Sequence, residues 1–211
     1  MNGRPGVTGG RAETTFPTEQ RGSVSTTMAI LPIITAPDPL LKKHCEPVQA
    51  VGDDVRRLIG DMLETMYKAP GIGLAAPQVG VLRRIIVVDV SRPGEGPGEG
   101  EAPDPHCLIN PEPLWLSERE NAHEEGCLSL PDQYAEVVRP AQIRVAFLDR
   151  DGERREMEAD GMLATCIQHE MDHLEGILFV DHISALRRSM ILRRLSKSKR
   201  GDKPMAKYAT A

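Results

Sequence analysis

The segment QHEMDHLEG, residues 168–176, holds two histidines four positions apart with a glutamate beside the first. On a helix, His169 and His173 lie on one face and can bind one metal ion, and Glu170 is placed to act as a general base. This combination is typical of metal-dependent hydrolases. Because the short pattern also arises by chance in charged helices, a third ligand has to be found elsewhere in the sequence.

The residues around this pattern predict a largely buried helix. Asp160 is a suitable N-cap and Gly176 is suitable to end the helix. The apolar residues between them are Met162, Ile167, Met171 and Leu174. We therefore expect the metal motif to lie on a helix inside the domain.

A catalytic metal of this kind needs three protein ligands and one open position. The histidine that metzincin peptidases place after the glycine is Phe179 here, and no glutamate follows Glu175 to serve as in thermolysin-like peptidases. Asp181 and His182 remain alternatives downstream. Upstream, Cys127 in EEGCLSLP is a soft ligand beside a glycine, and a thiolate with two imidazoles suits zinc or ferrous iron. We favour Cys127 as the third ligand.

The stretch GIGLAAPQVG, residues 71–80, fits the glycine pattern of dinucleotide-binding loops, and Asp89 follows at a suitable distance. Such a loop requires a strand before the glycines and a helix after them. Here helical spacing over residues 53–67 comes first, and the Val- and Ile-rich run 85–90 follows. The order helix, loop, strand excludes a nucleotide site and leaves Gln78, with two N–H donors, as the notable side chain.

Length and composition favour one soluble catalytic domain. The 211 residues suffice for one core, and no apolar run is long enough to span a bilayer or to form a secretory signal. The four cysteines form no C-x-x-C pair, so we expect reduced thiols, with Cys45, Cys107 and Cys166 as small buried side chains. We expect a cytoplasmic monomer without a membrane segment.

The chain divides into three parts. Residues 1–27 are rich in Gly, Ser, Thr and Arg, a composition that predicts a disordered extension. Met28 is then a candidate functional start, and an organelle-targeting peptide is the alternative for the preceding segment. Residues 28–182 form the catalytic domain, in which residues 92–105 have the composition of a surface loop between strands. Residues 183–211 form a basic helix and tail.

The C-terminal part is strongly basic. Residues 187–211 carry nine Lys and Arg and one acid, a net charge of +8, which leaves −13 for the rest of a chain whose total is −5. Apolar residues at helical spacing predict a helix that packs through one side. They are Ile183, Leu186, Met190, Ile191 and Leu195. The basic face either contacts nucleic acid or is only solvated.

Three segments of the chain resemble motifs of the peptide deformylase family. They read GIGLAAPQ, EGCLS and QHEMDHLEG, each complete and in the order of the family. The resemblance runs from about Met28 to the C-terminal helix, and only the N-terminal extension and the loop 92–105 depart from it. It implies an α+β fold, with antiparallel sheets around the motif helix and a C-terminal helix. It also implies an enzyme that removes the formyl group from the N-terminal formyl-methionine of new polypeptides and releases formate.

The resemblance implies a role for each metal-site residue. Cys127, His169 and His173 would hold one divalent metal, and Glu170 would stay off the metal and transfer a proton. The family favours ferrous iron, while zinc, nickel and cobalt also suit these ligands.

The resemblance likewise implies how substrate is bound. The Gln78 side chain and the backbone N–H of Leu128 would donate to the oxygen that becomes negative. Gly73 would let the substrate backbone run alongside, and Ile72, Leu128 and Cys166 would line an apolar pocket for the methionine side chain.

Family members act at the ribosome, so basic residues of the C-terminal helix would contact rRNA phosphates. These are Arg187, Arg188, Arg193, Arg194 and Lys197.

Two other functions compete with the deformylase. A different metallopeptidase would need Asp181 or His182 as the third ligand. A structural zinc protein is opposed by Glu170 and by the lack of a fourth ligand.

Overall fold

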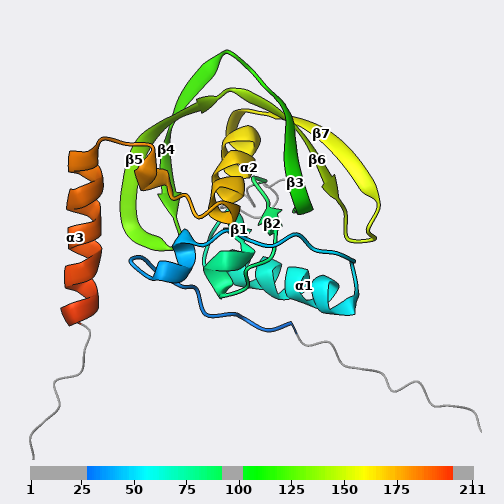
Figure 1. The fold of residues 1–211 in the computed structure, drawn as a ribbon, viewed down its shortest axis with the longest axis horizontal. Helices are drawn as coiled ribbons and strands as arrows, with labels where there is room; N and C mark the ends of the chain where they lie inside the picture. Colours follow the sequence, from blue (N-terminus) through cyan, green and yellow to red (C-terminus); the bar gives the residue numbers. More distant parts are fainter. Residues whose placement is uncertain (1–27, 92–101, 202–211) are drawn as a thin grey trace, which may run out of the picture.

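The structure is a computed structural model that describes residues 28–91 and 102–201 (Figure 1). The predicted N-terminal extension 1–27 and most of the predicted loop 92–105 lie outside the described residues. In chain order the helices and strands are α1 Asp53–Lys68, β1 Gly73–Ala75, β2 Ile85–Val88, β3 His106–Leu116, β4 Glu120–Cys127, β5 Leu130–Pro140, β6 Gln142–Leu148, β7 Arg154–Asp160, α2 Gly161–Leu174 and α3 Ala185–Gly201.

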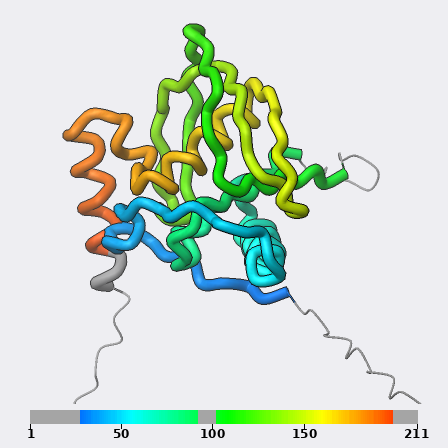
Figure 2. Tube along the Cα trace, turned by 45° about the vertical axis from the view of Figure 1, so that its right-hand side comes forward, coloured from blue at the N-terminus to red at the C-terminus, as the bar shows by residue number. Residues whose placement is uncertain are grey.

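Two antiparallel sheets surround α2, which confirms the predicted α+β class (Figures 1 and 2). The larger sheet has the strand order β1-β2-β3-β6-β7, and the smaller one pairs β4 with β5. In the part of the chain that the structure describes, β1 pairs only with β2 and is therefore an edge strand. The predicted loop at residues 71–80 thus contains a short strand, followed by the 3-10 helix Ala76–Val79.

Strand β2 separates two hydrophobic cores. Ile86 and Val88 pack with α2, whereas Ile85 and Val87 face α1. Side chains of a strand alternate between its faces, so a run of four apolar residues fits a strand that is covered on both. This arrangement explains why all four residues of β2, 85–88, are apolar instead of alternating with polar residues.

Helix α2 has the predicted position and burial. Asp160 is its N-cap residue, although its side chain makes no capping hydrogen bond. The helix ends at Leu174, and Gly176 follows with a φ of 70°. This left-handed conformation suits glycine, and a Cβ here would lie 2.6 Å from the carbonyl carbon of Lys42. Gly176 therefore lets the N-terminal segment pass directly under the end of α2.

Helix α3 packs on the domain through a narrower side than the sequence predicts. Ile191 and Leu195 are buried with β5 and the turn after α2, as expected. The prediction is wrong for Leu186 and Met190, which are 73% and 48% exposed. The reason is that α3 stands at the side of the molecule (Figure 1), so the domain covers Ile191 and Leu195 but leaves Leu186 and Met190 exposed.

None of the helices within residues 28–91 and 102–201 is both long and apolar enough to cross a bilayer.

We predict that Gly176→Ala lowers the free energy of unfolding by at least about 2 kcal/mol, because it adds left-handed strain and crowds Lys42. Urea denaturation measures the loss. Gly152→Ala is the matched control, since Gly152 also has a positive φ of 83° but its Cβ would meet Val51 at an ordinary 3.5 Å. Equal losses in the two variants would show that the contact with Lys42 contributes nothing.

Candidate active site

A cavity of about 500 Å³ lies between β1, the turn that joins β4 to β5, and the exposed end of α2. Eight of the nine site residues predicted from the sequence line it. They are Ile72, Gly73, Gln78, Cys127, Leu128, Cys166, His169 and Glu170. The ninth, His173, lies one helical turn further along α2 and is 1% exposed. The structure therefore brings together residues that are up to about a hundred positions apart in the sequence.

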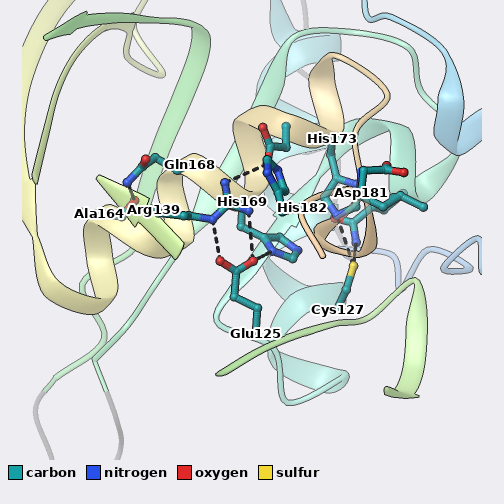
Figure 3. Close-up of polar contacts among 12 residues, drawn as sticks. Glu125, Cys127, Arg139, Ala164, Gln168, His169, His173, Asp181 and His182 are labelled. Carbon is teal, nitrogen blue, oxygen red and sulfur yellow. Dashed lines mark hydrogen bonds and ion pairs between the residues drawn. The ribbon is translucent and has the colours of Figure 1, made fainter. Parts of the chain in front are cut away.

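Cys127, His169 and His173 form a cluster of potential metal ligands. Their ligand atoms all lie within 4.8 Å of one another, and Cys127 Sγ is 3.2 Å from His173 Nε2 (Figure 3). Cys127 ends β4, while both histidines come from one face of α2. Three donors at this separation can converge on one ion.

The two alternative ligands are engaged elsewhere. Asp181 forms ion pairs with Lys42 and with Arg188. His182 Nε2 lies 2.7 Å from Asp172 Oδ2. Neither residue belongs to the cluster, so the geometry removes the support for a metallopeptidase that uses one of them.

A buried ion pair orients His169. Glu125 Oε2 lies 2.7 Å from His169 Nδ1, and Arg139 contacts the same carboxylate through Nε at 2.5 Å and Nη2 at 3.1 Å (Figure 3). Burial by itself raises the pKa of Glu125, but the bonds from His169 and Arg139 outweigh it and lower that pKa to about 2. The ionised carboxylate accepts a hydrogen bond from Nδ1, which leaves Nε2 of His169 to face the cluster.

The electrostatics of the cluster fit a metal ion. Burial by itself lowers the pKa of His169, but Cys127 and Glu125 hold it well above its usual value, so this spot stabilises positive charge. Burial and the neighbouring His169 hold the pKa of His173 well below its usual value, and the neutral imidazole is the form that binds metal. One sulfur and two imidazole nitrogens are a donor set suited to zinc or iron.

Glu170 faces the cavity from α2. Burial raises its pKa to about 7. Its Oε2 atom has no hydrogen-bond partner among the described residues. A Cβ on Gly73 would lie 2.7 Å from Cys166 Sγ and closer still to Glu170 Oε1. Only glycine lets β1 approach α2 this closely, so Gly73 creates the space that the carboxylate occupies.

Gln78 is held with its N–H groups toward the cluster. Its Oε1 accepts a hydrogen bond from the backbone N–H of Ala75 at 2.7 Å. Its Nε2 donates to Ser129 Oγ at 3.2 Å and lies 3.5 Å from Cys127 Sγ. The side chain is 1% exposed, so its amide is fixed before any ligand arrives. Leu128, in the turn between β4 and β5, lines the same cavity.

Several site residues were missed by the reasoning from sequence. Glu125 and Asp172 lie inside the motif segments, beside residues with predicted roles, so adjacency was a usable signal. Arg139 lies in β5, and Tyr134 lines the cavity with its ring against Gly126. Nothing in the local pattern around Arg139 marks it, because its partners come from other elements.

A buried Cys–His–His cluster with an adjacent glutamate, at the base of an open cavity, defines a metal-dependent hydrolase. The chain belongs to the polypeptide deformylase family, whose model matches residues 30–189. It removes the N-formyl group from newly synthesised polypeptides, as members of this metal-dependent family do.

Individual relatives cover most of the chain. The peptide deformylase of Methylocella silvestris is 53% identical over 86% of this chain and 91% of its own. The crystal structure of the Ehrlichia chaffeensis enzyme in complex with actinonin has a TM-score of 0.76 at 40% identity and covers 82% of this chain and 99% of that one. The Met-Ala-Ser-bound structure of the Acinetobacter baumannii enzyme has a TM-score of 0.68 at 36% identity, covering 74% and 99%.

We predict that Gly73→Ala lowers kcat about 100-fold, because the new methyl group displaces the carboxylate of Glu170. Formate release from an N-formyl-methionyl peptide measures the effect. Gly60→Ala, on α1, is the control, since its Cβ would meet only the flexible Met28 side chain, at 3.3 Å. Turnover that stays within a few fold of wild type in Gly73→Ala would contradict the prediction.

Proposed function

We propose that Cys127, His169 and His173 hold one ferrous ion, and that Glu170 and Gln78 complete the site that hydrolyses the formyl amide of N-terminal formyl-methionine. The carrying observation is the convergence of the three donor atoms, within 4.8 Å of one another, at a cavity that Glu170 and Gln78 also line.

The chain's own residues account for the proton transfer. A divalent cation held by Cys127, His169 and His173 would supply Lewis-acid activation of a water molecule at neutral pH. Glu170 Oε2 accepts a proton from the attacking water while the water oxygen bonds to the formyl carbon. Glu170 then delivers that proton to the amine nitrogen as the C–N bond breaks. The products are formate and a free amino terminus. Burial keeps bulk water from competing with Glu170 for the proton.

Two donors stabilise the negative charge that develops on the formyl oxygen. The Gln78 amide is preorganised by its bonds to Ala75 and Ser129, so its N–H needs no reorganisation during the reaction. The backbone N–H of Leu128 is the second donor. Loss of one such donor costs about 3 to 4 kcal/mol of barrier.

The substrate lies as an extended chain between the edges of β1 and β4. Gly73 offers its backbone without a side chain in the way, and Ile72, Leu128 and Cys166 form the apolar pocket for the methionine side chain. Support comes from the cavity, which residues of both strands line, and from the Acinetobacter baumannii relative, whose structure is bound to Met-Ala-Ser.

Ferrous iron is the proposed metal because family resemblance favours it and the soft thiolate with two imidazoles accepts it. Protein purified without oxygen should release formate from an N-formyl-methionyl peptide, contain about one iron per chain and leave the unformylated peptide intact. Backbone cleavage, or neither reaction from a metal-loaded sample, would overturn the proposed chemistry. Formate release with zinc as the resident metal would overturn the iron assignment alone.

We predict that Glu170→Ala keeps its metal but loses about 10²- to 10⁴-fold in turnover, because no other group at this position can transfer the proton. Metal content and formate release are measured on the same sample. Cys127→Ala is the companion variant and should lose the metal itself. Near-normal turnover in Glu170→Ala would refute the assigned role.

The enzyme works as a cytoplasmic monomer that meets its substrate at the ribosome through α3. Support comes from the basic residues that α3 exposes to solvent and from the burial of Ile191 and Leu195, which fixes the helix on the domain. An outward row of guanidinium and ammonium groups suits rRNA phosphates.

We predict that Arg193→Ala combined with Arg194→Ala weakens ribosome binding and lowers the slope of its salt dependence by about two, because two phosphate contacts are lost. Sedimentation with purified ribosomes at several salt concentrations measures both. The matched control is Arg119→Ala combined with Arg154→Ala, two exposed arginines on other elements. Deformylation of a free peptide should be unchanged in both variants, and wild-type ribosome affinity in the α3 variant would contradict the proposal.

A further inference from the structure

We propose that His182, which the reaction does not use, is a positioning residue for the ligand His169 and acts through Asp172, Arg139 and Glu125. The inference rests on the proposed function in one respect, namely that His169 is a metal ligand. It assigns a role to a side chain that lies outside the cavity, on the turn between α2 and α3.

The contacts form an unbroken chain from the surface to the cluster. His182 Nε2 lies 2.7 Å from Asp172 Oδ2, and Arg139 Nη1 lies 2.8 Å from the same oxygen. Arg139 then grips both oxygens of Glu125, whose Oε2 lies 2.7 Å from Nδ1 of His169. Figure 3 shows Glu125, Arg139 and His182 beside His169.

Exposure falls along this chain toward the metal site. The side chain of His182 is 34% exposed and that of Asp172 is 19% exposed, whereas Arg139 and Glu125 are 6% and 4% exposed. Charge-assisted bonds are stronger in a buried environment, and a fork of two bonds fixes the plane of a carboxylate. Water can therefore reach the Asp172 carboxylate. In the absence of His182, a water molecule at its position would compete with Arg139 for that carboxylate.

The segment that carries His182 also touches the ligand directly. Phe179 stacks on His169, with ring centroids 6.3 Å apart and an interplanar angle of 22°. The backbone N–H of His182 donates to the carbonyl of Phe179 at 3.1 Å, so the two residues form one turn. Phe179 therefore restrains the face of the imidazole, while His182 restrains its Nδ1 edge through the chain of contacts.

The consequence is a tighter hold on the metal. Without the donor at His182, Asp172 can turn toward solvent, Arg139 loses one anchor, and Glu125 no longer holds the His169 ring in one orientation. Outer partners of this type change metal affinity by about 10- to 100-fold when they are lost. We place His182 at the lower end of that range because it acts through three intermediates.

The test uses the full chain loaded with cobalt(II), whose visible absorption reports the geometry of a thiolate and imidazole site. His182→Leu removes the donor, and His182→Gln keeps an N–H at the position of Nε2. We expect His182→Leu to release cobalt to a chelator about 10-fold faster and to shift the absorption bands. His182→Gln should stay close to wild type. The thermal midpoint of each variant shows that the comparison is made on folded protein.

His106→Leu is the matched control. The side chain of His106 is 31% exposed and its Nε2 lies 3.6 Å from Asp104, which is not among the residues of the proposed route. Combining His182→Leu with Glu125→Gln should add little to the effect of Glu125→Gln alone, because both act on the same ring. Additive effects would overturn the proposed route.

The outcomes separate this inference from the metal site itself. Wild-type protein that takes up no cobalt, or takes it up equally well after Cys127→Ala, would overturn the metal site and the role of His182 with it. Normal uptake in wild type, with unchanged release and spectrum in His182→Leu, would overturn the role of His182 alone. The same faster release in His106→Leu would overturn it too, since the effect would then be global.

Discussion

The constraint on which the structure depends is that α2 is buried by two sheets and still carries a run of polar side chains. Burial of a polar group costs free energy unless its atoms have hydrogen-bond partners. Gln168 donates to the carbonyls of Pro140 and Ala164, and the Nδ1 edge of His169 is held by Glu125. Glu170 faces the cavity, and His169 and His173 belong to the cluster of potential metal ligands. The surrounding structure thus provides hydrogen-bond partners for Gln168, whereas Glu170 Oε2 has none among the described residues.

Burial also requires that the charges near the site be paired. Arg139 balances Glu125 inside the protein, where the removal of one partner would leave an uncompensated charge. The pair comes from neighbouring strands of the small sheet, β4 and β5, whose register is broken just before Cys127. Cys127, directly after this break, has its Sγ 3.2 Å from His173 Nε2 on α2. Sheet geometry, buried charge and ligand placement are therefore parts of one local arrangement.

The sequence predicts what depends on local spacing. The motif helix, the glycine that follows it and the run of apolar residues in β2 all express periodicity or turn chemistry that acts within a few positions. Residues whose role comes from tertiary contact are not predictable in this way. Arg139 reaches Asp172 across 33 positions, and Glu125 reaches His169 across 44. Leu186 and Met190 share the apolar spacing of α3 but remain exposed, because periodicity cannot say how wide a face the domain will cover.

The brevity of β1 has a consequence for what the molecule can associate with. A long free edge of a sheet is a template on which strands of other proteins add, and it leads to aggregation. The three residues of β1 give a neighbouring strand too little backbone to pair with stably. The shortness of this free edge therefore limits edge-to-edge association with other copies or other proteins.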